Sequence, residues 1–524
     1  MAATKANDEQ DVRLWLLNTL LTTPHRALDQ IWPVHREIVA QDPRFYVRLA
    51  AWYADHGDVR DHKEMFAVTL ILSDFAGHRD VGLAMLRELP PYQVVRVVDF
   101  IHGRKTTRKV REKTPDAAKG ARAGTKRAKP QAAAEPTKTV TESFGLFQNP
   151  PRSLKTEVER YLREREADAD WFDGTVLQAR KAVKRLYAVL HVKPGERAQR
   201  ILFDEDPPPD SRAFALKALA KATSPAEQAR MIVEHAVPYR VAATLVKQMT
   251  PTVLLALIDR MSPQELINNV ASLKRRGAFD NSELKALIDR KLEAAQTGTR
   301  VIAFKAGEAL KAAGKVSGEV RQRLEKVADA QVKAKGRIAR PTALLIDKSG
   351  SMSLAIELGK RIGAMISTVC ERELYVYAFD TVAYPIERGG GDLASWERAL
   401  AGIAANGGTA CGAPLEYMRL KKQYVEQVIL VTDEGDNTAP NFAPALAKYR
   451  EAVKVDPTVC IVRTPGAVST VADACRKAGV AVDVFEFCGD YYSLPNLVPL
   501  LAKPNRLELL MEIMEYPLPV RRAA

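Results

Sequence analysis

The sequence has few cysteines and no long apolar run. Its 5 cysteines are odd in number, lie in the last third of the chain and never form a C-x-x-C pair, which argues for reduced thiols and against a disulfide framework. No stretch of about 18 uncharged apolar residues is present to span a bilayer. The polar first residues lack the apolar core of a secretory signal. These absences predict a soluble, cytoplasmic protein with no membrane partner.

The motifs of common enzyme classes are also missing. The chain contains no G-x-x-x-x-G-K-[ST] phosphate loop, no H-E-x-x-H zinc motif, no G-x-S-x-G nucleophile elbow and no glycine fingerprint after a strand. Asp347 resembles a phosphoryl-transfer nucleophile, but Ser349 stands where such sites place a second aspartate. We therefore expect no catalytic residues and no enzymatic activity.

Acidic residues are outnumbered in the front part of the chain. The whole chain carries 78 Lys and Arg against 64 Asp and Glu, a net charge of +14. Residues 341–524 hold 19 basic and 22 acidic residues, so residues 1–340 hold 59 and 42, a net charge of +17. A surface of that sign attracts polyanions, of which nucleic acid is the commonest large one. A basic helical protein without such a partner has the same composition.

At 524 residues the chain is longer than one hydrophobic core usually supports, so we expect several domains. Residues 1–102 and 144–340 carry apolar residues at spacings of three and four, which is typical of short amphipathic helices. Capping residues precede several of these helices, namely Thr250, Ser262, Asn281 and Ser317. Helices of this kind stack in series, so we predict an α-helical solenoid of HEAT-like repeats in two parts.

Residues 103–143 separate the two helical parts and differ from them in composition. From Gly103 to Lys138 there are 12 basic and 3 acidic residues and no periodic apolar face. This composition predicts a disordered basic insert. It is equally compatible with a nucleic-acid-binding arm and with a solvated linker.

Residues 341–524 change to an alternation of strands and helices. We expect strands over residues 342–346, 374–379, 428–432, 458–462 and 480–487, with helical stretches between them. Such alternation predicts a parallel, doubly wound, Rossmann-like α/β domain. Ligands of such domains bind at the carboxyl ends of the strands.

Hard oxygen ligands follow the first of these strands. Asp347, Ser349 and Ser351 place one carboxylate and two hydroxyls on alternate positions of a tight turn. Two further donors are Thr409, in a Gly-Gly-Thr loop, and Asp433, directly after the third strand. A small divalent ion prefers about six oxygens and keeps several waters, so we predict a magnesium site, with manganese as the alternative. Asp and Ser also occur in turns for local reasons, and their combination here favours the metal.

This set of residues resembles the metal-ion-dependent adhesion site (MIDAS) of von Willebrand factor A domains. That site has the pattern D-x-S-x-S, a loop threonine and a strand-end aspartate, and all five positions match. The resemblance implies that the serines and the threonine bind the ion directly, that the aspartates act through water, and that an open position accepts an acidic oxygen of a partner. Glu434 and Asp436 depart from the small residue usual after the aspartate.

The helical part resembles the TROVE module of the Ro autoantigen family, in its bacterial form. The similarity lies in residues 42–53, residues 181–194, and residues 237–273 continuing to 299–313, which together span most of the chain. The basic insert is not a feature of the family, and the arginine usual just before His191 is displaced to Arg185. The resemblance implies a helical ring that binds small Y-like RNAs on its outer side and passes single-stranded ends of misfolded RNAs through its hole.

By the same resemblance, basic residues of the second helical part are candidates for RNA phosphate contact. They are Lys155, Arg180, Lys181, Lys184, Arg185, His191 and Lys193. Positions 180 and 184, like 181 and 185, lie one helical turn apart, which predicts a contiguous basic stripe; a solvated helix face has the same pattern. Such residues read backbone and shape, so no DNA specificity is expected. Bacterial relatives are linked to exoribonucleases, which implies such a nuclease as a protein partner.

These observations lead to the hypothesis of a non-catalytic RNA-binding protein of noncoding-RNA quality control or processing. The alternative is a protein-binding scaffold or co-factor whose metal site engages an acidic residue of a partner, such as a MoxR-type AAA+ ATPase. A basic helical surface favours RNA, whereas an acidic one would favour a protein partner.

Overall fold

The architecture comes from a computed structural model of the chain. The residues that it describes are 13, 16, 20, 28–57, 59–111, 137–297, 301, 306, 309, 318–334, 336–350, 352–387, 393–480, 482–487, 494–495, 497–502 and 506–521. Within these residues no helix is both long and apolar enough to cross a membrane.

The first helical part is a series of short helices. Their bounds are Leu28–Gln41 (α2), Pro43–His56 (α3), Arg60–Leu72 (α4), His78–Glu88 (α5) and Pro91–His102 (α6). Asp42 caps α3 by accepting a hydrogen bond from the Phe45 backbone N–H at 2.9 Å. Pro43 occupies the first turn of α3, where the missing N–H is not needed. The local sequence therefore defines where α3 begins.

A two-stranded antiparallel ribbon follows α6. It pairs β1, Arg104–Arg111, with β2, Thr137–Phe144, so the prediction of a disordered insert is wrong for these residues. Threonine and valine, which favour extended backbone, recur in both strands. This local preference outweighs the lack of a periodic apolar face. Residues 112–136 of the predicted insert lie outside the described residues.

The second helical part continues the series. Its helices are Arg152–Glu166 (α7), Ala169–Val189 (α8), Glu196–Leu202 (α9), Arg212–Leu219 (α10), Pro225–Glu234 (α11), Tyr239–Leu245 (α12), Pro251–Arg260 (α13), Pro263–Arg275 (α14), Ser282–Ala294 (α15) and Gly318–Lys333 (α17). The predicted caps Thr250, Ser262 and Asn281 are confirmed, because each side chain accepts a hydrogen bond from a backbone N–H of the first turn. Ser317 lies outside the described residues.

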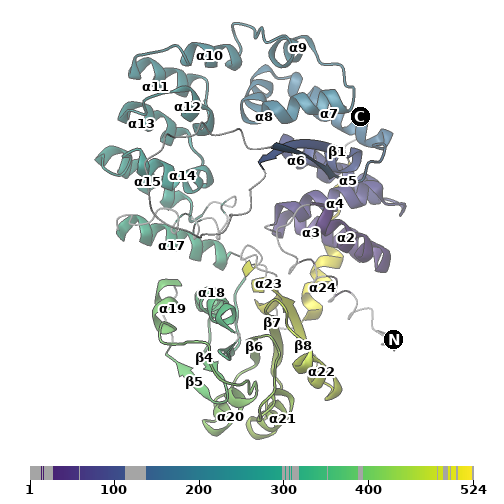
Figure 1. Ribbon diagram of the computed structural model, residues 1–524, viewed down its shortest axis with the longest axis vertical. Coiled ribbons are helices and arrows are strands. Elements are labelled where there is room, and N and C mark those ends of the chain that lie inside the picture. The colour runs from purple at the N-terminus through teal and green to yellow at the C-terminus, as the bar shows by residue number, and fades with distance from the viewer. Residues whose placement is uncertain are drawn as a thin grey trace, which may run out of the picture.

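Helices α2 to α17 follow one another along an arc, with a sheet domain formed by the rest of the chain below both ends of the arc (Figure 1). Helix α11 packs on α13, α13 on α15, and α15 on α17. Their apolar faces share one continuous core, which is how stacked repeats bury faces that no single repeat can bury alone. The predicted helical solenoid is confirmed.

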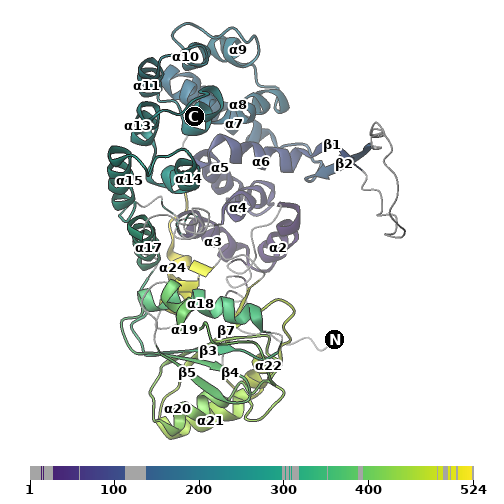
Figure 2. The same ribbon diagram turned by 60° about the vertical axis from the view of Figure 1, so that its left-hand side comes forward.

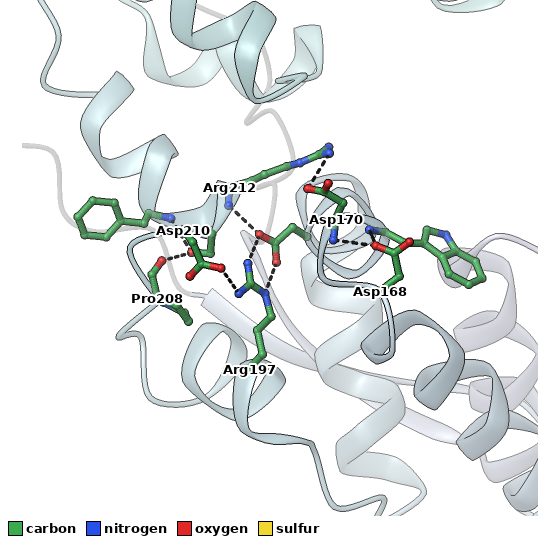
Figure 3. Close-up of polar contacts among 10 residues, drawn as sticks. Asp168, Asp170, Arg197, Pro208, Asp210 and Arg212 are labelled. Carbon is green, nitrogen blue, oxygen red and sulfur yellow. Dashed lines mark hydrogen bonds and ion pairs between the residues drawn. The ribbon is translucent and has the colours of Figure 1, made fainter.

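Arg197 of α9 and Arg212 at the start of α10, both labelled in Figure 3, donate hydrogen bonds to one buried carboxylate of α8. Asp173 of α8 accepts hydrogen bonds from Arg197 at 2.8 Å and 3.1 Å, and from the Arg212 backbone N–H at 2.8 Å. Arg197 also contacts the exposed Asp210 at 2.7 Å. One acidic side chain thus links three consecutive helices.

The remaining strands form one six-stranded sheet in the order β5-β4-β3-β6-β7-β8. Their bounds are Thr342–Asp347 (β3), Leu374–Phe379 (β4), Ala383–Ile386 (β5), Gln427–Thr432 (β6), Thr458–Arg463 (β7) and Val482–Glu486 (β8). All pairs are parallel except β4 with β5. The five predicted strands are confirmed, and the short antiparallel edge strand β5 was not predicted.

Helices cover both faces of this sheet (Figures 1 and 2). The helices that the structure describes in residues 341–524 are Ser353–Val369 (α18), Leu393–Ala399 (α19), Ala413–Leu420 (α20), Phe442–Val453 (α21), Thr470–Lys477 (α22), Leu497–Ala502 (α23) and Arg506–Glu515 (α24). Leu344 and Ile346 of β3 join one apolar cluster, and Ala343 and Leu345 join another, because alternate strand residues point to opposite faces. The predicted doubly wound domain is confirmed.

The last helix and the segment after it pack on the first helical part, although the sequence assigned residues 341–524 to one separate domain. Helix α24 lies against α3, and Trp52 of α3 donates to Glu512 at 3.0 Å. The Tyr516 hydroxyl donates to Asp55 at 2.5 Å. Helix α17 meanwhile contacts α18. Both ends of the arc are therefore joined to the sheet domain.

Candidate metal centre and basic surface

Asp347 ends β3 at the carboxyl edge of the sheet, and its side chain is buried. The carboxylate accepts hydrogen bonds from the Ser349 backbone N–H at 2.9 Å and from the Thr432 hydroxyl at 2.6 Å. Burial raises the pKa of Asp347, and the negative charge of nearby Asp433 also raises it. The site therefore concentrates negative charge at a place with little access to water.

A second loop closes over the turn that follows β3. The Gly350 backbone N–H donates to the Gly407 carbonyl at 3.2 Å. Two residues further, Thr409 is 4% exposed, as is Ser349. The Thr409 backbone N–H donates to the Asn437 side chain at 3.1 Å. The predicted glycine-flanked threonine is thus held between the turn after β3 and the segment after β6.

The two extra acids after Asp433 have structural roles. Buried Glu434 forms an ion pair with Arg463 and accepts a hydrogen bond from the Ala472 backbone N–H at 2.8 Å. Asp436 accepts from the backbone N–H groups of Cys411 at 3.0 Å and of Phe442 at 2.8 Å. These acceptors are occupied by the protein itself. Asp433 likewise accepts a hydrogen bond from the Gly435 backbone N–H at 2.9 Å, and it stays the predicted ligand of this segment.

The Lys348 side chain, next to Asp347 in the sequence, contacts residues other than Asp347. Lys348 pairs with Asp380 at 2.5 Å and lies 4.8 Å from the centre of the Tyr384 ring. Among the described residues, no lysine or arginine forms an ion pair with Asp347. The hydrogen-bond donors of Asp347 in the described part of the chain are therefore neutral groups, the Ser349 backbone N–H and the Thr432 hydroxyl.

The donors at this edge fit a hard divalent cation. Asp347, Ser349, Thr409 and Asp433 supply carboxylate and hydroxyl oxygens, the ligands that magnesium prefers. Over the described part of the chain no three His, Cys, Asp or Glu side chains are grouped to hold a metal, so the hydroxyls are needed to complete any such site. Ser351, the remaining predicted ligand, lies outside the described residues.

The predicted RNA-contact residues gather on α7, α8 and the turn after α8. The exposed members are Lys155, Arg180, Lys181, Lys184, His191 and Lys193. The backbone of α8 is kinked at Ala179, which precedes these residues, so positions 180 to 185 share one regular helical segment. The Lys184 ammonium lies 5.1 Å from the centre of the Phe203 ring, and Arg180 donates to the Ile201 carbonyl at 3.0 Å.

Arg185 differs from the other members of the stripe. Its guanidinium Nε lies 2.6 Å and 2.8 Å from the two carboxylate oxygens of Asp99. Asp99 is 4% exposed, and Arg104, the first residue of β1, lies 3.6 Å from it. Arg185 thus joins α8 to α6 and to the base of the ribbon, which gives it a structural task.

Sequence reasoning missed two contacts around the candidate metal centre. Thr432 ends a strand of apolar residues, and nothing in the sequence distinguishes its hydroxyl as a partner of Asp347. Lys348 directly follows β3 and Asp380 directly follows β4, and only the order of strands in the sheet brings the two together. Both contacts hold residues of the candidate metal centre in place, although neither Thr432 nor Asp380 is part of the D-x-S-x-S motif.

The helical arc and the sheet domain together match the fold of a solved Ro protein. The crystal structure of the Ro (RSR) protein of Deinococcus radiodurans has this fold, with a TM-score of 0.60 at 16% identity over 94% of this chain and 100% of that chain. The predicted resemblance is therefore confirmed for the fold. A von Willebrand factor type A structure from Catenulispora acidiphila has a TM-score of 0.24 at 19% identity, covering 34% of this chain and 43% of its own. No family model matches the sequence, and no curated protein matches it.

Proposed function

We propose that this protein is a non-catalytic RNA-binding protein that acts in noncoding-RNA quality control or processing. It binds Y-like or misfolded RNA on the outer side of the helical arc, and an exoribonuclease is its expected protein partner. The observation that carries the proposal is the group of exposed cations on α7, α8 and the following turn, on a helical part with a net charge of +17 over residues 1–340. Cations spaced along a helix bind RNA through its phosphates and its shape.

The test is a gel-shift titration over a range of salt with a structured RNA that carries a single-stranded tail. The variant is Lys181→Ala, Lys184→Ala and Lys193→Ala combined, because these exposed side chains can be removed without exposing a buried acid. Arg185 is left in place, since its loss would leave buried Asp99 without its 2.6 Å partner. If three phosphate contacts are lost, the slope of log affinity against log salt falls by about 2 to 3.

A matched control removes three exposed cations from the other limb of the arc. Lys221, Arg240 and Lys247 are exposed, and their alanine variant changes the net charge by the same amount. RNA affinity and salt slope are expected to stay close to wild type in this control. Equal losses in the two variants would mean that only net charge matters, and would contradict the proposed binding surface.

We propose in addition that the edge site of the A-type domain holds a divalent cation, magnesium in preference to manganese. A bound cation would supply a Lewis-acidic position for an acidic oxygen of a partner protein. The support is the buried Asp347 carboxylate, which two protein donors approach and no described cation pairs with. Through this site the protein could also serve the alternative function, as a scaffold for an acidic partner such as a MoxR-type AAA+ ATPase.

Thermal unfolding with and without magnesium tests this site. A ligand at about 100 times its Kd stabilises a folded protein by roughly 2.7 kcal/mol, so magnesium should raise the wild-type Tm. The Thr409→Ala variant should lose most of that increase. Thr381→Ala, an exposed threonine at the same edge of the sheet, is the control and should keep it. A wild-type Tm that does not respond to magnesium or manganese would overturn the metal proposal.

A further inference from the structure

We propose that the β1–β2 ribbon is a second RNA-contacting element, which binds the sugar–phosphate backbone beside the cations of α8. The inference rests on the proposed RNA-binding function and adds a separate part of the chain to it. Figure 1 shows the ribbon beside α6, and Figure 2 shows it projecting away from the helices. An element in this position can reach a polyanion that lies on the neighbouring helix.

The base of the ribbon is firmly mounted on α6. The backbone N–H groups of Leu146 and Gln148 donate to the carbonyls of Phe100 and Ile101 at 2.7 Å and 2.9 Å. The rings of Phe100 and Phe144 pack edge to face with centroids 5.6 Å apart. These contacts fix the direction in which the ribbon leaves the helices.

Two glycines make this mounting possible. Gly103 and Gly145, at the base of the two strands, have φ of 82° and 96°, values that side chains disfavour. A Cβ on Gly145 would lie 2.3 Å from the Phe100 carbonyl oxygen. The close approach of the ribbon to α6 thus requires glycine, which indicates a built junction and not a loose linker.

The ribbon begins next to the basic stripe of α8. Asp99 of α6 approaches both Arg104 of β1, at 3.6 Å, and Arg185 of α8, at 2.6 Å. Arg185 lies one residue after exposed Lys184. A single buried carboxylate therefore ties the start of the ribbon to the helix that carries the candidate RNA contacts.

The ribbon itself is strongly basic. Residues 104–111 contain five Lys or Arg and no acid, and residues 137–144 add one Lys and one Glu, a net charge of +5. Lys105, Lys109 and Arg111 are at register positions that share one face of the ribbon, opposite Ser143, Thr139 and Thr137. The fourth pair on that face is Thr107 with Thr141. These positions contain cations and hydroxyl residues with no carboxylate.

This composition favours RNA backbone over a protein partner. Protein interfaces have a central apolar region, and this face of the ribbon has no apolar position. Base-specific contacts to single strands use aromatic stacking, and the same face has no aromatic position. Evenly spaced cations and hydroxyl groups suit phosphates, whatever the base sequence.

The test uses the full chain with Lys105→Thr, Lys109→Thr and Arg111→Thr combined, because threonine preserves strand propensity. The same tailed RNA is titrated over a range of salt. The salt slope is expected to fall by about 2 and the affinity near physiological salt by on the order of 10-fold. A charge-preserving variant, Lys105→Arg, Lys109→Arg and Arg111→Lys, should bind as wild type does.

The outcomes separate the inference from the function on which it rests. If wild type binds RNA and the threonine variant binds with the same slope and affinity, the inference is overturned and the ribbon serves another partner, such as an acidic protein. A loss that the charge-preserving variant shares would indicate damage to the fold and also overturn it. If wild type binds no RNA, the proposed function itself fails. Unchanged Tm in both variants is the check on folding.

Discussion

At the scale of single residues, buried charges do structural work throughout this molecule. Asp173 links three helices, Asp99 ties the ribbon base to α8, and Glu434 holds Arg463 and the start of α22. Breaking a buried pair by removing one partner is costly, because the remaining charge stays without compensation. Asp347 is the exception, since it is buried without a described cationic partner. That contrast is the support for the cation site that we propose at Asp347.

Replacement of Asp173 should destabilise the arc. Its carboxylate is 3% exposed and holds Arg197 and the Arg212 backbone together (Figure 3), so Asp173→Ala should lower the free energy of unfolding by about 3 kcal/mol. Urea denaturation followed by circular dichroism measures this. Asp210→Ala, which removes the exposed partner of the same Arg197, is the matched control. A smaller effect for Asp173 than for Asp210 would contradict the assigned role.

Stability should depend on pH through His35. Burial lowers the pKa of His35 well below its ordinary value of 6.5, and the nearby His62 lowers it further; its ring also contacts the Tyr46 hydroxyl at 2.7 Å. Below pH 6.5 the unfolded chain therefore takes up a proton that the folded protein does not, so stability falls as the pH falls. The expected contribution is about 1.4 kcal/mol per pH unit until the lowered folded pKa is reached.

Comparison with His35→Gln isolates that contribution. Glutamine retains hydrogen-bonding groups but does not titrate. Burial raises the pKa of Glu64 to about 7. Through Glu64 the free energy of unfolding therefore decreases as the pH rises from 4.5 to 7, which is opposite to the effect of His35. Glu64 is present in both proteins, so its contribution cancels when the slope of unfolding free energy against pH is compared between wild type and His35→Gln. Identical pH profiles of unfolding would show that His35 is not the responsible group.

At the scale of helices and strands, the sequence predicted the features that depend on neighbouring residues, namely helix caps and strands. The caps at Thr250, Ser262 and Asn281 and the five parallel strands follow from neighbouring residues alone, and the structure contains them. The sequence did not predict the β1–β2 ribbon. Its Thr and Lys residues form no apolar face, so the apolar periodicity that indicates a strand is absent. Its mounting depends on Gly103 and Gly145 meeting α6, a tertiary contact that no local pattern reveals.

The cap of α15 provides a test at this scale. The Asn281 side chain accepts hydrogen bonds from the backbone N–H groups of Glu283 at 3.0 Å and Leu284 at 3.1 Å. Asn281→Ala should therefore reduce the free energy of unfolding by about 1 kcal/mol, whereas Asn281→Ser should keep most of it. Chemical denaturation of the three proteins measures both. Equal stability of the alanine and serine variants would mean that the cap adds little.

At the scale of the whole molecule, the two parts are less separate than the sequence suggests. Helix α24 packs on α3, and Arg521 reaches buried Glu157 of α7 at 2.7 Å. The sequence could not show this, because α24 has an ordinary amphipathic pattern and its partner lies more than 400 residues earlier. That the predicted metal ligands lie at one edge of the sheet could be predicted, in contrast, because the strand ends of a parallel sheet converge there.

In the whole molecule, we propose that RNA lies along α7, α8 and the β1–β2 ribbon. The most direct measurement is ultraviolet crosslinking of the tailed RNA to the full-length protein, followed by mass spectrometry of the crosslinked peptides. We expect crosslinks concentrated in residues 104–111, 152–166 and 180–193. Crosslinks concentrated instead on α11 to α15, or on the sheet domain, would contradict it.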